Sequence, residues 1–455
     1  MYRHVHMVGI GGAGMAAIAK VLLAMGTVVS GSDLAAGEAT KELEQCGARV
    51  YIGHRAEQIG PAEVVVVSTA IGPDNPEVLA ARAAGIPVLH RSEMLAEIMH
   101  AKKGLAVAGA HGKTTITSML AFVLHHCGLD PTFVIGGVVP GLGGARYGRG
   151  ELVIAEADES DRSFLRYRPH IAVVSSIESD HLEHYDGTFA KMVEAFGQFL
   201  HNVPVEGGLA ILNAGDPHLQ VIGRELACRV IWYGRPAHAD YRALEIEAHD
   251  HRTSFLVSER GHLLGRFSLC IPGEHNVENA LTVVAVAREL GLEMDELAVH
   301  LAAFPGAKRR FEILADGEVL VVDDYAHHPS EIKATIAAAR KGYPGRRLVA
   351  VFQPHRYTRT HFLFTELAGS FSAADLVVLT EVYAPPPDQW IPGAEGAALA
   401  AAAGRESGRP VHFVPERAEL PGFLWRMLKP GDVVLFMGAG DITLAAKELA
   451  EQMRA

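Results

Sequence analysis

Cysteine is scarce in this sequence of 455 residues. The four cysteines, at positions 46, 127, 228 and 270, lie far apart and show none of the short spacings that are typical of zinc ligands. We therefore expect free, buried thiols in a reducing compartment rather than disulfides, which favours a cytoplasmic protein.

Long apolar runs and a basic excess are also missing. No run approaches the roughly 20 apolar residues that a membrane helix needs. The chain enters an apolar strand and a glycine turn at once, so no signal peptide is expected. The formal net charge is −12 and no basic stripe stands out. We expect a soluble monomer or homodimer that binds neither nucleic acid nor membrane.

Apolar residues make up 49% of the chain and charged residues 21%, which is typical of a globular protein with real cores. Apolar strands alternate with helical patterns, which predicts an α/β architecture with mainly parallel sheets. Polar boundaries near 101–104 and 304–312 predict three domains, at 1–101, 102–308 and 309–455. The first and last are expected to be Rossmann-like, and the middle one to carry a phosphate loop.

The phosphate loop is Gly109-Ala-His-Gly-Lys-Thr-Thr115, between an apolar strand, Leu105 to Ala108, and an amphipathic helix, Ile116 to His126. The N–H groups of the turn and the positive end of the helix face the same anion. Lys113 adds a mobile charge, and the Thr114 hydroxyl can bind Mg²⁺. The pattern is shorter than the usual phosphate loop. It predicts ATP binding, and a glycine turn with a surface lysine is the ordinary alternative.

A second glycine turn, Gly9-Ile-Gly-Gly-Ala-Gly14, follows the first strand and precedes a helix, a second strand and Asp33. This is the dinucleotide fingerprint in its expected context. Alone it predicts NAD, but a phosphate loop about 95 residues further on does not fit a simple dehydrogenase. A UDP-type pyrophosphate meets the same physical need, and a turn without any ligand is the third alternative.

Two acidic segments follow apolar strands of the middle domain. Glu156 to Asp161 follows one strand, and Glu178 to His184 follows another. The carboxyl ends of parallel strands meet at one edge, so both segments are expected beside the phosphate loop. Carboxylates there suit Mg²⁺, and His181 could ligate a second metal. For each acid taken singly, a solvated loop charge is the alternative.

Polar groups follow later elements in the same way. Asn276 and Asn279 share one face of a predicted helix and could contact a nucleobase, with helix capping by Asn276 as the alternative. Segments 323–330 and 353–360 each follow an apolar strand. Arg356 and Arg359 in the second of these suit a carboxylate ligand.

Together these motifs resemble those of the Mur ligases of peptidoglycan synthesis, in family order over essentially the whole chain. The segments that carry the resemblance are Gly9 to Met15 with Ser30 to Asp33, Gly109 to Thr115, Glu156 to Asp161, Ser179 to Leu182, Gly273 to Asn276, Arg309 to Phe311, Asp323 to Pro329, and Phe352 to Arg359.

The resemblance implies a three-domain ligase that uses ATP and Mg²⁺, with Mn²⁺ able to replace Mg²⁺. The N-terminal domain would bind the UDP moiety, not NAD. The central domain would bind ATP, and the C-terminal domain would close on it and help to hold the amino acid. The implied reaction joins L-alanine to the lactyl carboxylate of UDP-N-acetylmuramate through an acyl phosphate, and it yields ADP and phosphate.

The resemblance also implies roles for individual residues. Contacts to the UDP-sugar fall on Gly11, Gly12, Ala13, Gly14, Met15, Asp33 and Ser68. Contacts to ATP fall on Gly109, Ala110, His111, Gly112, Lys113, Thr114, Thr115, His275, Asn276, Asn279, Arg310 and Asp324. Metal ligands would be Thr114, Glu156 and His181, and catalytic residues Lys113, His181, Arg310 and Asp324. The amino acid would meet Tyr325, His327, His355, Arg356 and Arg359.

The chain departs from the family pattern at a few positions. Ala110 stands in place of a usual threonine, and Ser176 in place of a common asparagine. The run from Pro385 to Trp390 interrupts a stretch that is Ala-Gly-Glu in relatives. Other Mur ligases carry a carbamylated lysine after the metal histidine. The nearest lysine here is Lys191, so no carbamate is expected.

Three alternatives stay open at this point. A related ligase adds a murein tripeptide to the same UDP-sugar, and it would need room for a peptide near Arg356 and Arg359. A nicotinamide dehydrogenase would explain the first glycine turn alone. A non-catalytic protein that binds sugar nucleotides would leave the combination of Lys113, Glu156 and His181 unexplained.

Overall fold

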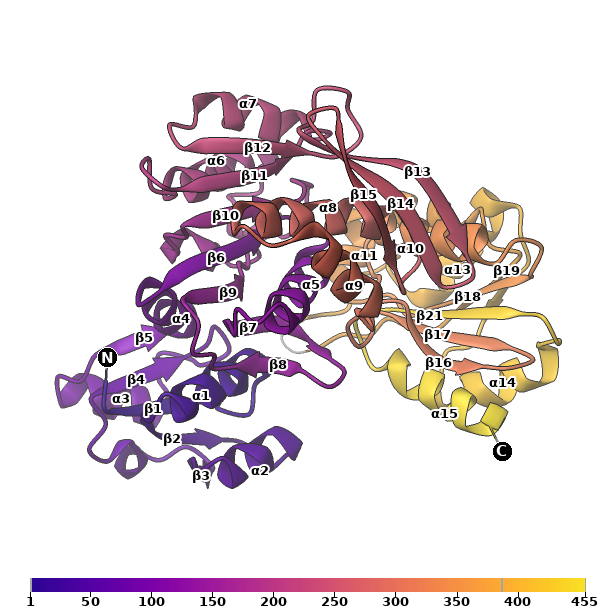
Figure 1. Ribbon diagram of the computed structural model, residues 1–455. Helices are drawn as coiled ribbons and strands as arrows, with labels where there is room; N and C mark the ends of the chain where they lie inside the picture. The colour runs from indigo at the N-terminus through magenta and orange to yellow at the C-terminus, as the bar shows by residue number, and fades with distance from the viewer. Residues whose placement is uncertain (1, 386–387, 455) are drawn as a thin grey trace. The chain divides into compact units, whose positions relative to one another are not determined.

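The computed structural model describes residues 2–385 and 388–454 and contains three β-sheets in succession along the chain (Figure 1). The predicted α/β class with mainly parallel sheets is confirmed. Each sheet lies within one of the three predicted segments. The domain boundaries at 101/102 and 308/309 themselves stay predictions. Among the described residues, none of the helices combines the length and the apolar character needed to cross a bilayer.

The first sheet has five parallel strands in the order β3-β2-β1-β4-β5. Helices α1, α2 and α4 pack on one face, and α3 with the 3-10 helix η1 on the other. The strand order reverses between β1 and β4, and ligands of open parallel sheets commonly bind outside the carboxyl ends of the strands at such a switch point. The elements are β1 His4–Val8, α1 Ala13–Ala24, β2 Val28–Asp33, α2 Glu38–Gln45, β3 Arg49–Ile52, η1 Ala56–Ile59, β4 Val64–Val67, α3 Pro76–Ala83, β5 Val88–His90 and α4 Arg91–His100.

The second sheet has ten strands in the order β15-β14-β13-β12-β11-β10-β6-β9-β7-β8. Strand β6, which precedes the phosphate loop, lies between β9 and β10 and is parallel to both. Its elements are β6 Lys103–Ala108, α5 Lys113–His126, β7 Thr132–Val139, β8 Gly143–Arg146, β9 Leu152–Glu156, η2 Ser163–Arg166, β10 Ile171–Val174, η3 Leu182–His184, α6 Phe189–His201, β11 Leu209–Asn213, α7 Pro217–Glu225, β12 Arg229–Tyr233, β13 Tyr241–His249, β14 Arg252–Glu259, β15 His262–Leu269, α8 Glu274–Glu289 and α9 Met294–Ala303.

Helix α5 differs from the amphipathic helix predicted after the phosphate loop. Every residue from Thr114 to Leu124 is buried, so the helix has no solvent-facing side over that length. The buried Thr117 hydroxyl is satisfied within the helix, since it donates to the carbonyl of Lys113 at 2.9 Å. The phosphate loop therefore rests on a helix that is embedded in its domain.

The third sheet has six strands in the order β16-β17-β21-β18-β19-β20, and only β16 is antiparallel to its neighbour. Helices α10 and α13 cover one face, and α14 and α15 the other. The elements are β16 Glu312–Asp316, β17 Leu320–Asp324, α10 Pro329–Gly342, β18 Leu348–Phe352, α11 Tyr357–Phe362, α12 Phe364–Ala368, η4 Gly369–Phe371, β19 Leu376–Leu379, α13 Gly396–Ser407, β20 Val411–Phe413, η5 Arg417–Glu419, α14 Leu420–Met427, β21 Val433–Met437 and α15 Ile442–Arg454.

Residue contacts divide the chain into two compact units. The first contains the first sheet, strands β6 to β12 and parts of β13 to β15, α8 and α9. The second contains the third sheet together with the remaining parts of β13 to β15 and the start of α8. The first two predicted domains thus share one compact unit, because α1 packs on β7 and β8 and α4 packs on β6 and β9.

Candidate active site

The glycine turn after β1 leads into the N-terminus of α1. Gly9 has a φ of +74°, and Gly12 caps the N-terminus of α1. The Gly11 N–H donates to Oδ2 of Asp33 at 2.8 Å, so this carboxylate holds the turn in place. Residues 11–15 therefore lie at the positive end of α1, and Ser68 follows β4 on the other side of the switch point. Their contact with a UDP-sugar stays a prediction.

Arg91 is a further residue at this turn that the sequence did not reveal. Its Nη1 lies 3.5 Å from the position that a Cβ on Gly14 would take. Its Nη2 lies 3.2 Å from Oδ2 of Asp158, which belongs to the acidic segment after β9. The guanidinium thus links the first glycine turn to the second sheet. Only its place directly after a strand could have indicated this.

A buried polar network lies near the same glycine turn, at the end of β2. The side chains of His6 and Glu77 are fully buried, and their Nε2 and Oε1 atoms lie 3.5 Å apart. The Ser32 hydroxyl donates to Oε2 of Glu77 at 2.5 Å, and Nδ1 of His54 lies 3.3 Å from the same oxygen. Burial raises the pKa of Glu77, but the hydrogen bonds from His6 and Ser32 outweigh it and the net shift is downward. The network fixes the end of β2 next to Asp33.

The phosphate loop requires glycine at two positions. Gly109 has a φ of +129°, and a Cβ there would lie 2.2 Å from Oγ of Ser175. Gly112 has a φ of +82°, and its Cβ would lie 2.6 Å from Oδ1 of Asn279. Both conformations and both close approaches exclude larger side chains. The loop is therefore held between the end of β10 and helix α8.

The substituted position Ala110 contributes through its backbone. Its N–H donates to the carbonyl of Ser176 at 2.9 Å. Since both partners are main-chain atoms, alanine for threonine and serine for asparagine leave this contact intact. Of the run from Pro385 to Trp390, positions 386 and 387 lie outside the described residues.

Lys113 is ion-paired inside the site. Its Nζ lies 2.7 Å from Oε1 of Glu159 and 2.6 Å from the carbonyl oxygen of Gly109. Burial by itself would lower the pKa of Lys113, but the negative charges of Glu159 and Glu156 raise it, so the ammonium stays charged. The Tyr185 hydroxyl donates to the backbone carbonyl of Glu159 at 2.5 Å. The sequence placed Glu159 in an acidic segment without indicating this pairing.

Thr114 and Glu156 lie together, as their predicted metal role requires. The Thr114 hydroxyl is 3.0 Å and 3.2 Å from the two carboxylate oxygens of Glu156. The Gly136 N–H donates to Oε2 of Glu156 at 3.1 Å and fixes its orientation. Hard oxygen donors beside a phosphate loop fit Mg²⁺.

His181 has other neighbours. Its Nε2 lies 3.4 Å from Asp180 and its Nδ1 lies 3.6 Å from Glu183. The contact with His181 lowers the pKa of Glu183 to about 2, against the opposing effect of burial. Within the described residues, His181 belongs to no group of three metal-ligating side chains. Its metal role stays a prediction.

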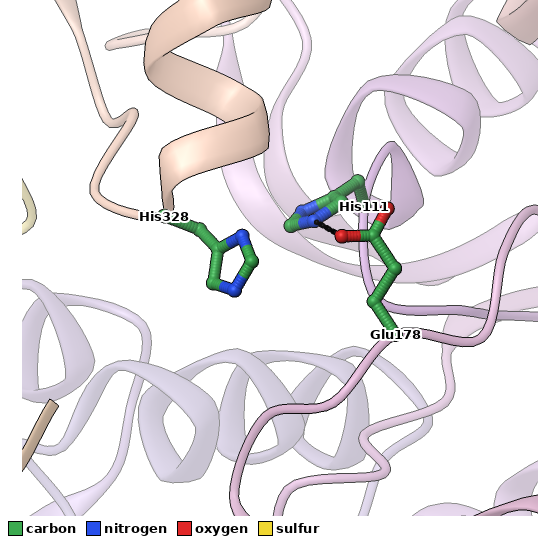
Figure 2. Close-up of side chains that lie close together, drawn as sticks. All are labelled: His111, Glu178 and His328. Carbon is green, nitrogen blue, oxygen red and sulfur yellow. Dashed lines mark hydrogen bonds and ion pairs between the residues drawn. The ribbon is translucent and has the colours of Figure 1, made fainter. Parts of the chain in front are cut away.

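His111 in the phosphate loop pairs with the acidic segment after β10. Its Nε2 lies 3.2 Å from Oε2 of Glu178, and Figure 2 shows this contact. The loop is thereby joined by a side-chain contact to the second acidic segment, which the sequence predicted would lie beside it.

The amides on α8 are both buried but have different neighbours. The helix begins at Glu274, so Asn276 lies inside its first turn rather than at the cap. Its Nδ2 donates to the carbonyl of Pro272 at 2.7 Å. Asn279 packs against Gly112 of the phosphate loop. His275 packs beside Gly273, where a Cβ would lie 2.5 Å from its ring.

Asp324 ends β17 as a buried carboxyl group. It accepts hydrogen bonds from the N–H groups of Phe311 at 2.7 Å and Ala326 at 2.8 Å. Burial raises its pKa to about 6, against opposing effects from the Arg310 guanidinium and the two N–H groups. The Arg310 guanidinium is thus close enough to Asp324 to affect its pKa, and the contact of both residues with ATP stays a prediction.

This raised pKa predicts a pH-dependent stability. The folded chain keeps the Asp324 proton above the ordinary pKa of 3.8, so stability falls as pH rises through about 6. The shift corresponds to about 3 kcal/mol. Chemical denaturation from pH 4 to 7 should show a steeper loss of stability in the parent chain than in Asp324→Asn. Asp316→Asn, exposed on β16, should keep the parent slope. Equal slopes for the parent and Asp324→Asn would contradict this assignment.

The residues predicted to meet the amino acid gather at the carboxyl ends of β17 and β18. The ring of His327 lies 5.4 Å from that of Tyr325 and 6.2 Å from that of His355. Nη1 of Arg359 lies 3.2 Å from Nδ1 of His355. Burial, together with Arg359 and other nearby cations, lowers the pKa of His355 to about 3, so it is neutral at physiological pH. Arg356 has a φ of +67°.

Sequence analysis missed two members of this cluster. The Tyr383 ring stacks on His355 with centroids 5.7 Å apart, and its carbonyl accepts from the Arg356 N–H at 2.8 Å. The Cζ atom of the Arg309 guanidinium lies over the Tyr325 ring, 4.9 Å from its centroid. Tyr383 comes from a loop without a motif, so only the folded chain brings it here. The cluster is cationic and aromatic, which suits a small anion.

Open parallel sheets that carry a glycine turn and a phosphate loop at their carboxyl ends define a multidomain α/β protein of the nucleotide-binding class. Three family models agree with this in chain order. They are the "Mur ligase family, catalytic domain" over residues 4–103, the "Mur ligase middle domain" over 107–287 and the "Mur ligase, glutamate ligase domain" over 309–440. The chain belongs to the Mur ligase family.

Relatives match along nearly the whole chain. The UDP-N-acetylmuramate–L-alanine ligase of Symbiobacterium thermophilum is 48% identical, over 99% of this chain and 95% of the relative. That of Trichlorobacter lovleyi is 46% identical, over 99% and 98%. The crystal structure of the UDP-N-acetylmuramate–alanine ligase from Thermotoga maritima matches with a TM-score of 0.83 at 30% identity, over 100% and 99%. A murein peptide ligase from Psychrobacter arcticus matches with a TM-score of 0.69 at 26% identity, over 99% and 98%.

Proposed function

We propose that this chain is an ATP-dependent ligase that joins L-alanine to the lactyl carboxylate of UDP-N-acetylmuramate. The observation that carries the proposal is full-length identity of 46–48% to ligases of that name, combined with a complete phosphate loop. Cytoplasmic localisation and a monomeric or homodimeric state stay predictions alongside it.

The reaction proceeds in two steps. A lactyl carboxylate oxygen attacks the γ-phosphorus of ATP, the bond to ADP breaks, and an acyl phosphate forms. The amine of L-alanine then attacks the acyl carbon, and phosphate leaves from the tetrahedral intermediate. Two anions must approach each other in the first step, so the site has to neutralise charge and fix geometry.

The first step is assigned to the phosphate loop. N–H groups of the loop from Gly109 to Thr115 bind the phosphates, apart from that of Ala110, which donates to the Ser176 carbonyl. The Lys113 ammonium contacts the β- and γ-phosphates. Thr114 and Glu156 would hold Mg²⁺, and bound Mg²⁺ would supply charge neutralisation at the transferred phosphoryl group. Asn279 supports the loop through its contact with Gly112.

The remaining roles are assigned to the glycine turn after β1 and to the cationic cluster at the ends of β17 and β18. The glycine turn around Gly11 and Asp33 binds the pyrophosphate of the UDP-sugar. The cationic cluster around His355 and Arg359 binds the carboxylate of the amino acid. Arg310 and Asp324 are assigned to the nucleotide, and His181 to a second metal.

Phosphate release from Mg·ATP with UDP-N-acetylmuramate tests the proposal. Release should depend on L-alanine and yield a product heavier by one alanyl residue. Glycine, L-serine and the murein tripeptide should be run in parallel. Phosphate release with the tripeptide alone would favour a second candidate function, that of a murein tripeptide ligase. The structural match to a murein peptide ligase is the observation behind this candidate. No release with any acceptor would refute both.

Arg359→Ala should impair use of L-alanine more than use of ATP. The guanidinium provides the charge for a carboxylate at this cluster and keeps His355 neutral through its proximity. We expect the KM for L-alanine to rise at least about tenfold, as for loss of a charged hydrogen bond, while the KM for ATP changes little. Arg405→Ala on α13 is the control. An equal effect on both substrates would remove Arg359 from the amino-acid site.

A further inference from the structure

Three metal-ligating side chains converge at the end of α5 opposite the phosphate loop. They are Cys127, directly after α5, and Glu296 and His300 on α9. The thiol sulfur, a carboxylate oxygen and an imidazole nitrogen all lie within 4.8 Å of one another. The group unites segments that are far apart in sequence, which is why the cysteine spacing gave no sign of a metal site.

The geometry of the group is favourable for a cation. Glu296 and His300 are four residues apart on one helix, and their Oε1 and Nε2 atoms lie 3.9 Å apart. The His126 ring lies beside that of His300, with centroids 5.6 Å apart, and its Nδ1 lies 2.8 Å from the carbonyl oxygen of Phe122. The last carbonyl groups of α5 add a partial negative charge at this point.

The donor set indicates the class of metal. One sulfur, one nitrogen and one oxygen suit a borderline-soft ion such as Zn²⁺, whereas Mg²⁺ prefers oxygen alone. Ligand atoms of a tetrahedral zinc site are about 3.5 Å apart. The three side chains would therefore close in by about 1 Å, within the range of ordinary rotamer adjustments.

We propose that Cys127, Glu296 and His300 form a zinc-class metal site whose fourth position is open to water. Helix α5 has 14 residues, which places this site about 21 Å from the phosphate loop. The metal therefore takes no part in phosphoryl transfer. It ties the C-terminal end of α5 to α9 and stabilises the domain that carries the phosphate loop.

Without metal the thiol form of Cys127 is favoured. Burial and the Glu296 carboxylate raise the pKa of Cys127 to about 11, so it stays protonated at neutral pH. A bound divalent cation reverses this preference and holds the thiolate. The expectation that all four thiols are buried is correct for Cys228 alone, since Cys127 and Cys270 are half-buried and Cys46 is exposed.

Cobalt(II) titration tests the site, because cobalt replaces zinc and reports thiolate ligation by absorption. The full-length, tag-free protein is stripped of metal and titrated in excess Mg²⁺, which occupies the oxygen sites. We expect one equivalent of Co²⁺ with a thiolate-to-cobalt charge-transfer band, displaced by Zn²⁺. Cys127→Ser should lose the band and bind at least about tenfold more weakly. His300→Ala should weaken binding similarly.

Two matched controls separate the site from nonspecific binding. Cys46→Ser removes another thiol, and His125→Ala removes a neighbouring imidazole that pairs with Asp130 and Arg146 instead. Both should retain the band and the parent affinity. Zn²⁺ should also raise the melting temperature of the parent but not of Cys127→Ser, whose fold is checked by circular dichroism. A band that persists in Cys127→Ser, or cobalt binding without any band, would overturn the proposal.

Discussion

Lys113→Ala should abolish ATP-dependent ligation, with a loss of at least about a thousandfold in kcat. The Lys113 ammonium lies inside the phosphate loop, 2.6 Å from the Gly109 carbonyl oxygen. Without it, the developing charge on the transferred phosphoryl group loses its contact with a protein cation in the loop and keeps only the loop N–H groups and any bound Mg²⁺. Phosphate release and mass analysis of the product measure the effect.

The control for this variant has to account for Glu159. Removing the lysine leaves that buried carboxylate without its counter-ion, which costs about 3–5 kcal/mol of stability. The double variant Lys113→Ala/Glu159→Gln removes this cost and should be folded but still inactive. Binding of UDP-N-acetylmuramate should be preserved in both, since its glycine turn belongs to the first sheet. Lost UDP-sugar binding in the folded double variant would contradict the division of roles.

Glu156→Ala should raise the Mg²⁺ concentration for half-maximal activity by about 10- to 100-fold. The carboxylate is held by Thr114 and by the Gly136 N–H, so its oxygens are positioned before any metal binds. Glu156→Gln should show a similar rise, because the amide fills the space without the charge.

A Mg²⁺ titration of activity at saturating substrates measures this shift. Glu151→Gln removes an exposed carboxylate just before β9 and serves as the matched control. It should keep the parent Mg²⁺ dependence. An unchanged Mg²⁺ requirement in Glu156→Ala would place the metal elsewhere.

The elements of the fold could be predicted because local patterns determine them. Runs such as Leu105 to Ala108 and Leu348 to Phe352 are apolar throughout, as parallel strands buried on both faces must be. The residues that follow such strands then lie at one edge by topology alone. This is why the acidic segment after β9 could be expected beside the phosphate loop, where Glu156 contacts Thr114.

Contacts between distant segments could not be predicted in the same way. Glu159 was one acid among several, and nothing local distinguishes a lysine's counter-ion from a solvated charge. The side chain of Glu77 on α3 is fully buried with His6 and Ser32 as its neighbours, and nothing in its local sequence indicates this. The sharing of one compact unit by the first two sheets likewise depends on helix packing, which a boundary-like sequence at 101–104 does not reveal.

Because Lys113 is paired with Glu159, a bound nucleotide has to replace the Glu159 carboxylate as the partner of the Lys113 ammonium. An incoming phosphate does not meet a bare cation, because a carboxylate 2.7 Å away already competes for it. An anion of low charge interacts too weakly with Lys113 to displace the carboxylate of Glu159, which the fold holds in place. A polyphosphate carries several charges and also accepts hydrogen bonds from the N–H groups of the loop, so its total interaction is much stronger. The ligand-free loop thus selects for anions that bind Lys113 strongly enough to displace Glu159.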